Sequence, residues 1–82
     1  MHEVGIAHSV IEAVQAEAAA RVGSVPVKVM VRVGAFAGVD PDALAFGFEA
    51  LTAGTEWGNL KLEIERAAGD ELDLIYVELE EP

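Results

Sequence analysis

The chain begins Met1-His2-Glu3, which places an α-amine, an imidazole and a carboxylate within three consecutive residues. Because methionyl aminopeptidases generally require a small second residue and His2 is large, we expect Met1 to be retained and to carry the amine. The Met1 amine and the His2 amide nitrogen would form a five-membered chelate ring with a metal. The His2 amide nitrogen and the His2 imidazole would form a six-membered ring with the same metal. Nitrogen donors in a plane suit Ni(II) or Cu(II), so the sequence predicts a metal site here. The alternative is a frayed terminus.

The composition describes the scaffold that would carry such a site. Eighty-two residues make one small domain, near the lower limit of what a hydrophobic core stabilises unaided. A hydrophobic fraction of 52% against 24% charged residues excludes a disordered chain. The absence of cysteine excludes disulfides, thiolate zinc sites and thiol nucleophiles. Because the sequence contains neither a secretion signal nor an apolar run long enough for a membrane span, we expect a cytoplasmic protein.

The charge balance limits the partners. With 15 acidic and 5 basic residues the net charge is -10, and such a surface repels phosphate backbones. We therefore expect neither nucleic acid nor membrane as a partner. Divalent cations or a basic protein face suit this charge better.

Two stretches predict helices. The first covers roughly residues 6–22 and ends near Gly23, because apolar residues recur at helical spacing; they are Ile6, Val10, Ile11, Val14, Ala18 and Val22. His8 lies off that stripe, either as a second imidazole for the metal or simply exposed. The second helix covers roughly residues 41–52, with Asp40 as N-cap and Pro41 at the first helical position. Its buried stripe is predicted to be Leu44, Phe48 and Leu51.

Three stretches predict strands. Valine alternates with other residues from Val25 to Val33, which predicts a strand with one buried face and Pro26 at its start or on an edge. Alternation recurs at residues 60–65. Residues 72–79 change phase near Leu74-Ile75, which predicts either a bulge there or a strand covered on both faces. The short stretch between the last two strands predicts an antiparallel hairpin.

The order helix, strand, helix, strand, strand predicts an α+β fold. We expect a two-layer domain with two helices packed on one face of a three-stranded, mainly antiparallel sheet, spanning residues 1–82 as a single unit. No residues at suitable local spacing form a catalytic set, so a small metalloenzyme is disfavoured and we do not expect an enzyme.

Several segments of the chain resemble the HypA/HybF hydrogenase maturation proteins. The resemblance is carried by Met1-His2-Glu3 and by residues 33–44, 46–49, 51–55, 62–65 and 69–72. It implies a nickel metallochaperone that works with a maturation GTPase of the HypB type and delivers Ni(II) to the large subunit of nickel–iron hydrogenase. In that family the nickel site is the N-terminal triplet, matched by Met1, His2 and Glu3. An aspartate also contributes, matched by Asp40, which has a second interpretation as a helix N-cap.

The chain also departs from this family. The resemblance implies a second, zinc-binding domain with paired Cys-x-x-Cys motifs between the last two strands, and here residues 65–70 connect those strands directly. We therefore expect no zinc. Two alternatives to a nickel chaperone remain open: an adaptor that docks a maturation partner through its acidic and apolar surface, and a site that prefers copper, which binds nitrogen donors more tightly than nickel.

Overall fold

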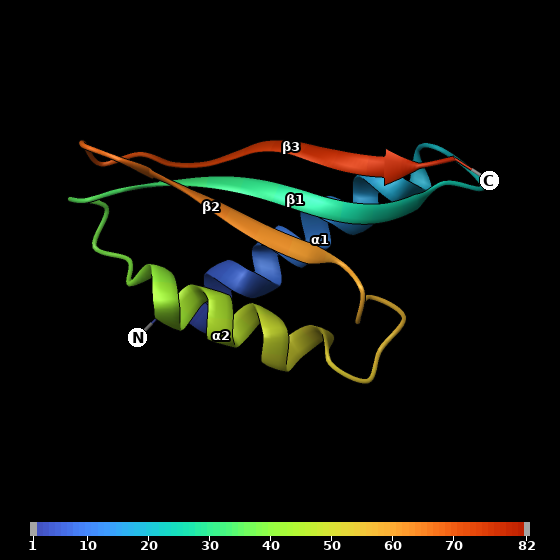
Figure 1. Cartoon of the computed structure of the whole chain (residues 1–82), viewed down its shortest axis with the longest axis horizontal. Helices are drawn as coiled ribbons and strands as arrows, with labels where there is room; N and C mark the ends of the chain where they lie inside the picture. The colour runs from blue at the N-terminus through green and yellow to red at the C-terminus, as the bar shows by residue number, and fades with distance from the viewer. Residues whose placement is uncertain (1, 82) are drawn as a thin grey trace.

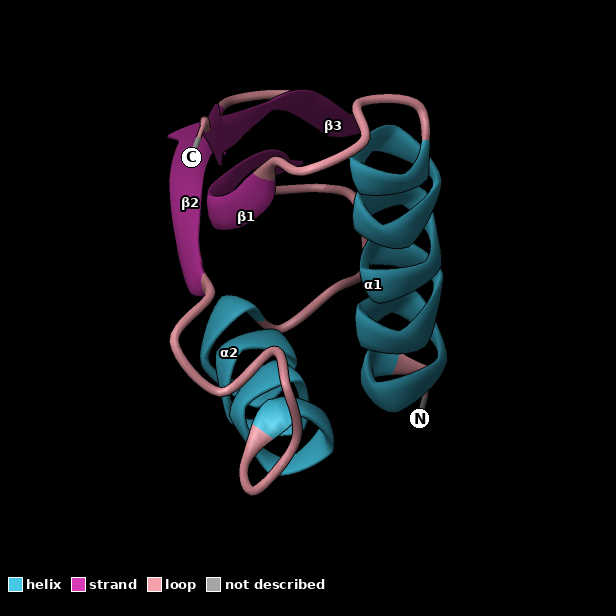
Figure 2. Cartoon of the chain, turned by 90° about the vertical axis from the view of Figure 1, so that its right-hand side faces the viewer, coloured by secondary structure: helices cyan, strands magenta, loops and turns pink. Residues whose placement is uncertain are grey.

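The computed structural model describes residues 2–81 and has a mixed α+β architecture. Its elements, in chain order, are α1 (Glu3–Ala19), β1 (Val25–Gly34), α2 (Pro41–Thr52), β2 (Lys61–Ala67) and β3 (Leu72–Glu80). Figure 2 shows both helices on the same side of the sheet, with α1 nearer to β3 and α2 nearer to β2. The predicted two-layer domain is therefore confirmed. Within residues 2–81, neither helix is long and apolar enough to cross a membrane.

The strand order corrects the predicted hairpin. The sheet has the order β2-β1-β3, with β1 in the centre, parallel to β2 and antiparallel to β3 (Figure 1). It is therefore mixed, and the last two strands do not pair with each other. Strands two positions apart are separated by roughly 10 Å, which four residues can span, so a short connection does not require a hairpin.

The connection from β2 to β3 crosses the end of β1 and is held there by backbone hydrogen bonds. The N–H groups of Gly34, Ala35 and Phe36 donate to the carbonyl oxygens of Glu71, Ala67 and Gly69 at 2.7, 2.8 and 2.8 Å. A Cβ at Gly34 would collide with the Gly69 carbonyl oxygen. Only glycine therefore lets the two segments approach this closely.

Two bulges shape the pairing of β1 with β3. Met30 pairs with Tyr76 and Val31 with Leu74, so Ile75 has no partner, which confirms the predicted bulge. A second irregularity lies between Pro26 and Lys28. Because one extra residue moves the following side chains to the other face, Val25 is 58% exposed although the unbroken alternation placed it inside.

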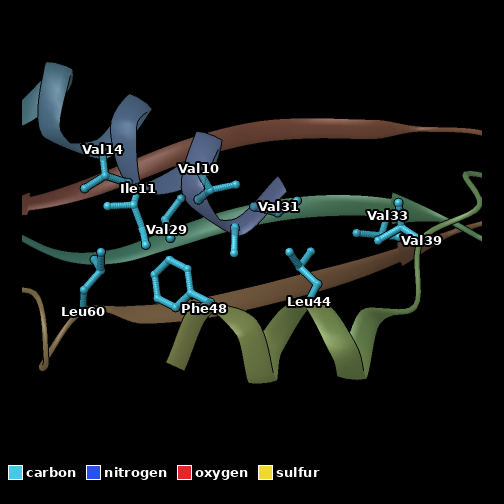
Figure 3. Packing of buried hydrophobic residues seen from close by; sticks show 11 residues of the cluster. Val10, Ile11, Val14, Val29, Val31, Val33, Val39, Leu44, Phe48 and Leu60 are labelled. Carbon is cyan, nitrogen blue, oxygen red and sulfur yellow. The ribbon is translucent and has the colours of Figure 1, made fainter. Parts of the chain in front are cut away.

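The core lies between the central strand and the two helices (Figure 3). Its buried side chains come mainly from three elements: Val29, Val31 and Val33 of β1, Ala7, Val10, Ile11 and Val14 of α1, and Leu44 and Phe48 of α2. The prediction that Leu51 is buried was wrong, since it is 37% exposed, and Val22, predicted to end the first helix, lies outside it and is 97% exposed. Helix α1 ends at Ala19, and the turn bond from the Arg21 N–H to the Ala18 oxygen diverts the chain before Val22.

Candidate metal centre

The N-termini of the two helices lie together. His2 is the N-cap of α1 and Asp40 is the N-cap of α2. At both positions the first N–H groups point away from the helix without a helical partner. Two hydrogen bonds between segments more than 35 residues apart join these ends, one made by His2 and one by Glu3.

A glycine permits this approach. Gly47 is buried in α2 facing the first turns of α1, and a Cβ there would lie 3.4 Å from Val4 Cγ2 and 3.9 Å from Ala7 Cβ. A larger side chain would push α1 away. The small residue therefore sets how closely the start of α1 packs over α2, and with it the position of His2 and Glu3.

The His2 imidazole is oriented by the backbone. Its Nε2 lies 3.2 Å from the Gly38 carbonyl oxygen, which can only accept, so Nε2 donates. In the neutral imidazole the lone pair is then on Nδ1, the nitrogen that closes a six-membered ring with the residue's own amide nitrogen. A metal-ligating histidine commonly donates its other ring N–H to a carbonyl in this way. The exposed imidazole is thus presented in the tautomer that metal binding requires.

Glu3 binds the loop that precedes α2. Its Oε2 accepts a hydrogen bond of 3.2 Å from the Asp40 N–H. That bond is the largest cause of a lowered pKa for the Glu3 carboxyl, and the N–H of Glu3 itself is the second. Glu3 therefore stays ionised at the positive end of α1, where a carboxylate is favoured.

Asp40 performs the capping role that was predicted for it. Its Oδ1 accepts from the N–H groups of Asp42 and Ala43 at 3.0 and 3.4 Å. Both bonds reach Oδ1, so Oδ2 remains available to a further partner. Its contribution to a metal site stays a prediction.

The structure brings His2, Glu3 and Asp40 to one place, and Met1 lies outside the described residues. Within residues 2–81, no three histidine, aspartate or glutamate side chains are arranged to hold a metal ion on their own. The contribution of the His2 backbone nitrogen and of the Met1 amine to a metal site stays a prediction. His8 does not join it: the ring is exposed and Nδ1 lies 3.8 Å from Glu12 Oε1, one helical turn on.

Sequence reasoning missed Gly38 and Gly47. Gly38 contributes a carbonyl, which every residue type possesses, so nothing in its identity signals the contact with His2. Its φ of +76° does need glycine, and that direction of the loop aims the carbonyl. Gly47 interrupts an otherwise strong helix, and a glycine inside a helix often marks close packing.

Comparisons with known proteins find similar sequences. Residues 1–71 match the family described as "Hydrogenase/urease nickel incorporation, metallochaperone, hypA". A hydrogenase maturation factor HypA from Roseiflexus sp. (strain RS-1) is 48% identical over 66 residues, covering 79% of this chain and 53% of that protein. The one from Rhizobium leguminosarum bv. viciae is 45% identical over 71 residues, covering 85% and 62%. The chain thus spans between about half and three fifths of the length of these curated relatives.

Proposed function

The chain belongs to the HypA family of nickel-incorporation metallochaperones, and from this premise we propose that it binds Ni(II) at its N-terminus as cargo for the maturation of nickel–iron hydrogenase. The proposed donors are the Met1 amine, the His2 amide nitrogen and His2 Nδ1, with the Glu3 amide or carboxylate and Asp40 beside them. The observation that carries the proposal is the Nε2 bond to Gly38, which leaves the lone pair of the neutral imidazole on Nδ1.

The position at a helix start suits this chemistry. The His2 N–H precedes the first turn, so a metal can displace its proton without breaking a helical hydrogen bond. The positive end of α1 opposes a cation, and the carboxylates of Glu3 and Asp40 offset that effect. An exposed site also lets an acceptor's donors reach the metal, as a chaperone requires to pass on its cargo.

The proposal treats residues 1–82 as one nickel-binding type of domain. The family match ends at residue 71, where β3 begins. The zinc domain that the resemblance implies would lie between β2 and β3, where residues 68–71 connect the two strands directly. The proposal assigns no zinc to the chain, which has no cysteine. Its partners would be a HypB-type GTPase and the hydrogenase large subunit, in the cytoplasm.

An adaptor without a metal role is the second candidate. The observation that favours it is the exposure of two aromatic side chains, Phe36 in the loop before α2 and Phe46 on α2, which are 80% and 73% exposed. Exposed aromatic side chains are common at protein interfaces. This function predicts that capture of a maturation partner survives His2→Ala and is lost when Phe36 and Phe46 are changed to serine.

Calorimetric titration with Ni(II) tests the primary proposal. We expect one site per chain, weakened by about 100-fold or more in His2→Ala and, separately, when Gly-Ser is fused ahead of Met1. His8→Ala is the matched control, since it removes the other histidine and should leave the affinity unchanged. Circular dichroism verifies that each variant is folded. Unchanged affinity in both N-terminal variants would refute nickel binding at this site.

A further inference from the structure

Strand β3 has an open edge. It lies at one side of the sheet, with β1 as its only neighbour among the described strands, so the backbone groups that point away from β1 have no strand partner. The strand is nine residues long and carries several half-exposed apolar side chains: Leu72, Leu74, Ile75 and Tyr76. Such an edge can pair with another extended chain unless something blocks it.

An apolar groove runs beside this edge. It lies between α1 and β3, with a volume of about 480 Å³. Gly5, Ile6 and Ser9 form its helix side, and Leu72 and Leu74 its strand side. Leu72 and Leu74 are 41% and 39% exposed because α1 does not fill this space. A chain added to β3 would therefore find a place for its inward side chains as well as backbone partners.

The two faces of β3 differ in chemistry. Leu72, Leu74 and Val77 pair with the buried valines of β1 and so face the helices. Asp73 and Glu78 pair with Arg32 and Lys28, whose side chains form ion pairs with Glu65 and Glu63 of β2 on the opposite face. The strand is thus apolar toward the groove, and its other face carries the carboxylates Asp73, Glu78 and Glu80 together with Tyr76, which pairs with Met30.

The negative charge along β3 determines which kind of chain can pair with its open edge. Among the described ion pairs, Glu78 is held by Lys28, and none involves Asp73, Glu80 or Glu81. A second copy of the chain laid antiparallel along β3 would set carboxylates against carboxylates, which is destabilising in cross-strand pairs. Cross-strand pairs of opposite charge are stabilising. The edge therefore disfavours self-association and favours a basic strand.

We propose that the open edge of β3 and the adjoining groove bind an extended segment of a partner protein in which apolar and basic residues alternate. The segment adds to the sheet beside β3, placing its apolar side chains in the groove between α1 and β3 and its lysines or arginines beside Asp73, Glu78 and Glu80. The interaction does not rest on nickel binding. It does place the segment at the end of the groove that His2 lines, beside the proposed metal site.

Binding of a synthetic peptide tests the inference. The probe is a ten-residue peptide of alternating valine and lysine, titrated into the ¹⁵N-labelled chain in buffer containing EDTA. The expected result is saturable binding, with amide shifts confined to β3 and to the groove side of α1 and with slower hydrogen exchange along β3. Two control peptides carry glutamate in place of lysine, or N-methyl groups on alternate amides. Each should bind at least about tenfold more weakly.

Charge reversal gives the matched pair of variants. The double substitution of Asp73→Lys and Glu80→Lys should weaken binding of the lysine peptide and restore binding of the glutamate peptide. Glu49→Lys with Glu56→Lys changes the net charge equally on a distant surface and should leave the preference unaltered. Because the buffer contains EDTA, binding of the lysine peptide is measured without nickel, which separates this inference from the nickel proposal. No binding, equal binding of the N-methylated peptide, or an equal effect of both charge-reversal pairs would overturn it.

Discussion

The two helices begin in different ways. At the start of α2, the Asp40 side chain accepts hydrogen bonds from the N–H groups of Asp42 and Ala43, and Pro41 occupies the first helical position. At the start of α1, His2 makes no side-chain cap and bonds instead to Gly38, 36 residues away. One start is fixed by its own neighbours, and the other by a distant loop.

That contrast separates stability from function. A local cap satisfies helical N–H groups and stabilises the helix, whatever the rest of the chain does. At α1 the His2 side chain makes no cap, and its long-range bond to Gly38 orients an imidazole beside the start of the helix. The start of α2 is thus stabilised by its own cap, whereas the imidazole at the start of α1 has no capping role.

The largest effect is expected at Gly47, where the first turns of α1 pack closely against α2. Gly47→Leu should lower the free energy of unfolding by about 1–3 kcal/mol, because the added atoms meet Val4 and Ala7. It should also weaken nickel binding by displacing the first turn of α1. Urea denaturation and calorimetry measure the two effects.

Gly47→Ala is the matched control for that variant. Its Cβ would make ordinary contact at 3.4 Å, and alanine gains up to about 1 kcal/mol in helix propensity. We expect stability equal to or above that of the parent chain and unchanged nickel affinity. If leucine were tolerated as well as alanine, close packing at Gly47 would not position the site.

The comparison is sharpened by equivalent changes at the two N-caps. Asp40→Ala should cost about 1 kcal/mol of stability, within a range of about 0.5–2, because two N–H groups of α2 lose their acceptor. His2→Ala should cost less than about 0.5 kcal/mol, since it removes an exposed side chain that caps nothing. Urea denaturation of both variants beside the parent chain measures the two losses of stability. Equal losses at both positions would show that the contrast between the helix starts is wrong.

The smallest effect concerns the pH dependence of stability. The pKa of Glu3 is lowered in the folded chain, chiefly by the Asp40 N–H, so the folded state holds this proton less tightly than the unfolded state. Its contribution is present above the ordinary pKa of 4.5 and is lost as the pH falls through the lowered value. Glu3→Gln removes the charge, and we expect a shallower loss of stability below about pH 4.5.

Urea denaturation between neutral and acid pH measures that slope, and Glu12→Gln, on the exposed face of α1, serves as control. The interpretation fails if both variants reproduce the acid dependence of the parent chain.

Features set by neighbouring residues were predictable from the sequence. The start of α2 follows from Asp40 and Pro41, and the bulge at Ile75 follows from the change of phase in β3. The pairing of β3 with β1 was not predictable from the sequence, because a four-residue connection can form either a hairpin or a crossing over Gly34. The hydrogen bond from His2 to Gly38 joins a side chain to a backbone carbonyl across the fold, and no local sequence pattern indicates it.

The central claim is that Ni(II) binds at the uncapped start of α1. One equivalent of Ni(II) added to the ¹⁵N-labelled chain, with Met1 unblocked, tests this most directly by mapping which amide resonances shift or broaden. We expect changes centred on His2 and Glu3 that extend to Gly38 and Asp40 and spare the acidic end of β3. Changes centred on Glu78, Glu80 and Glu81, or spread evenly over the carboxylates, would contradict it.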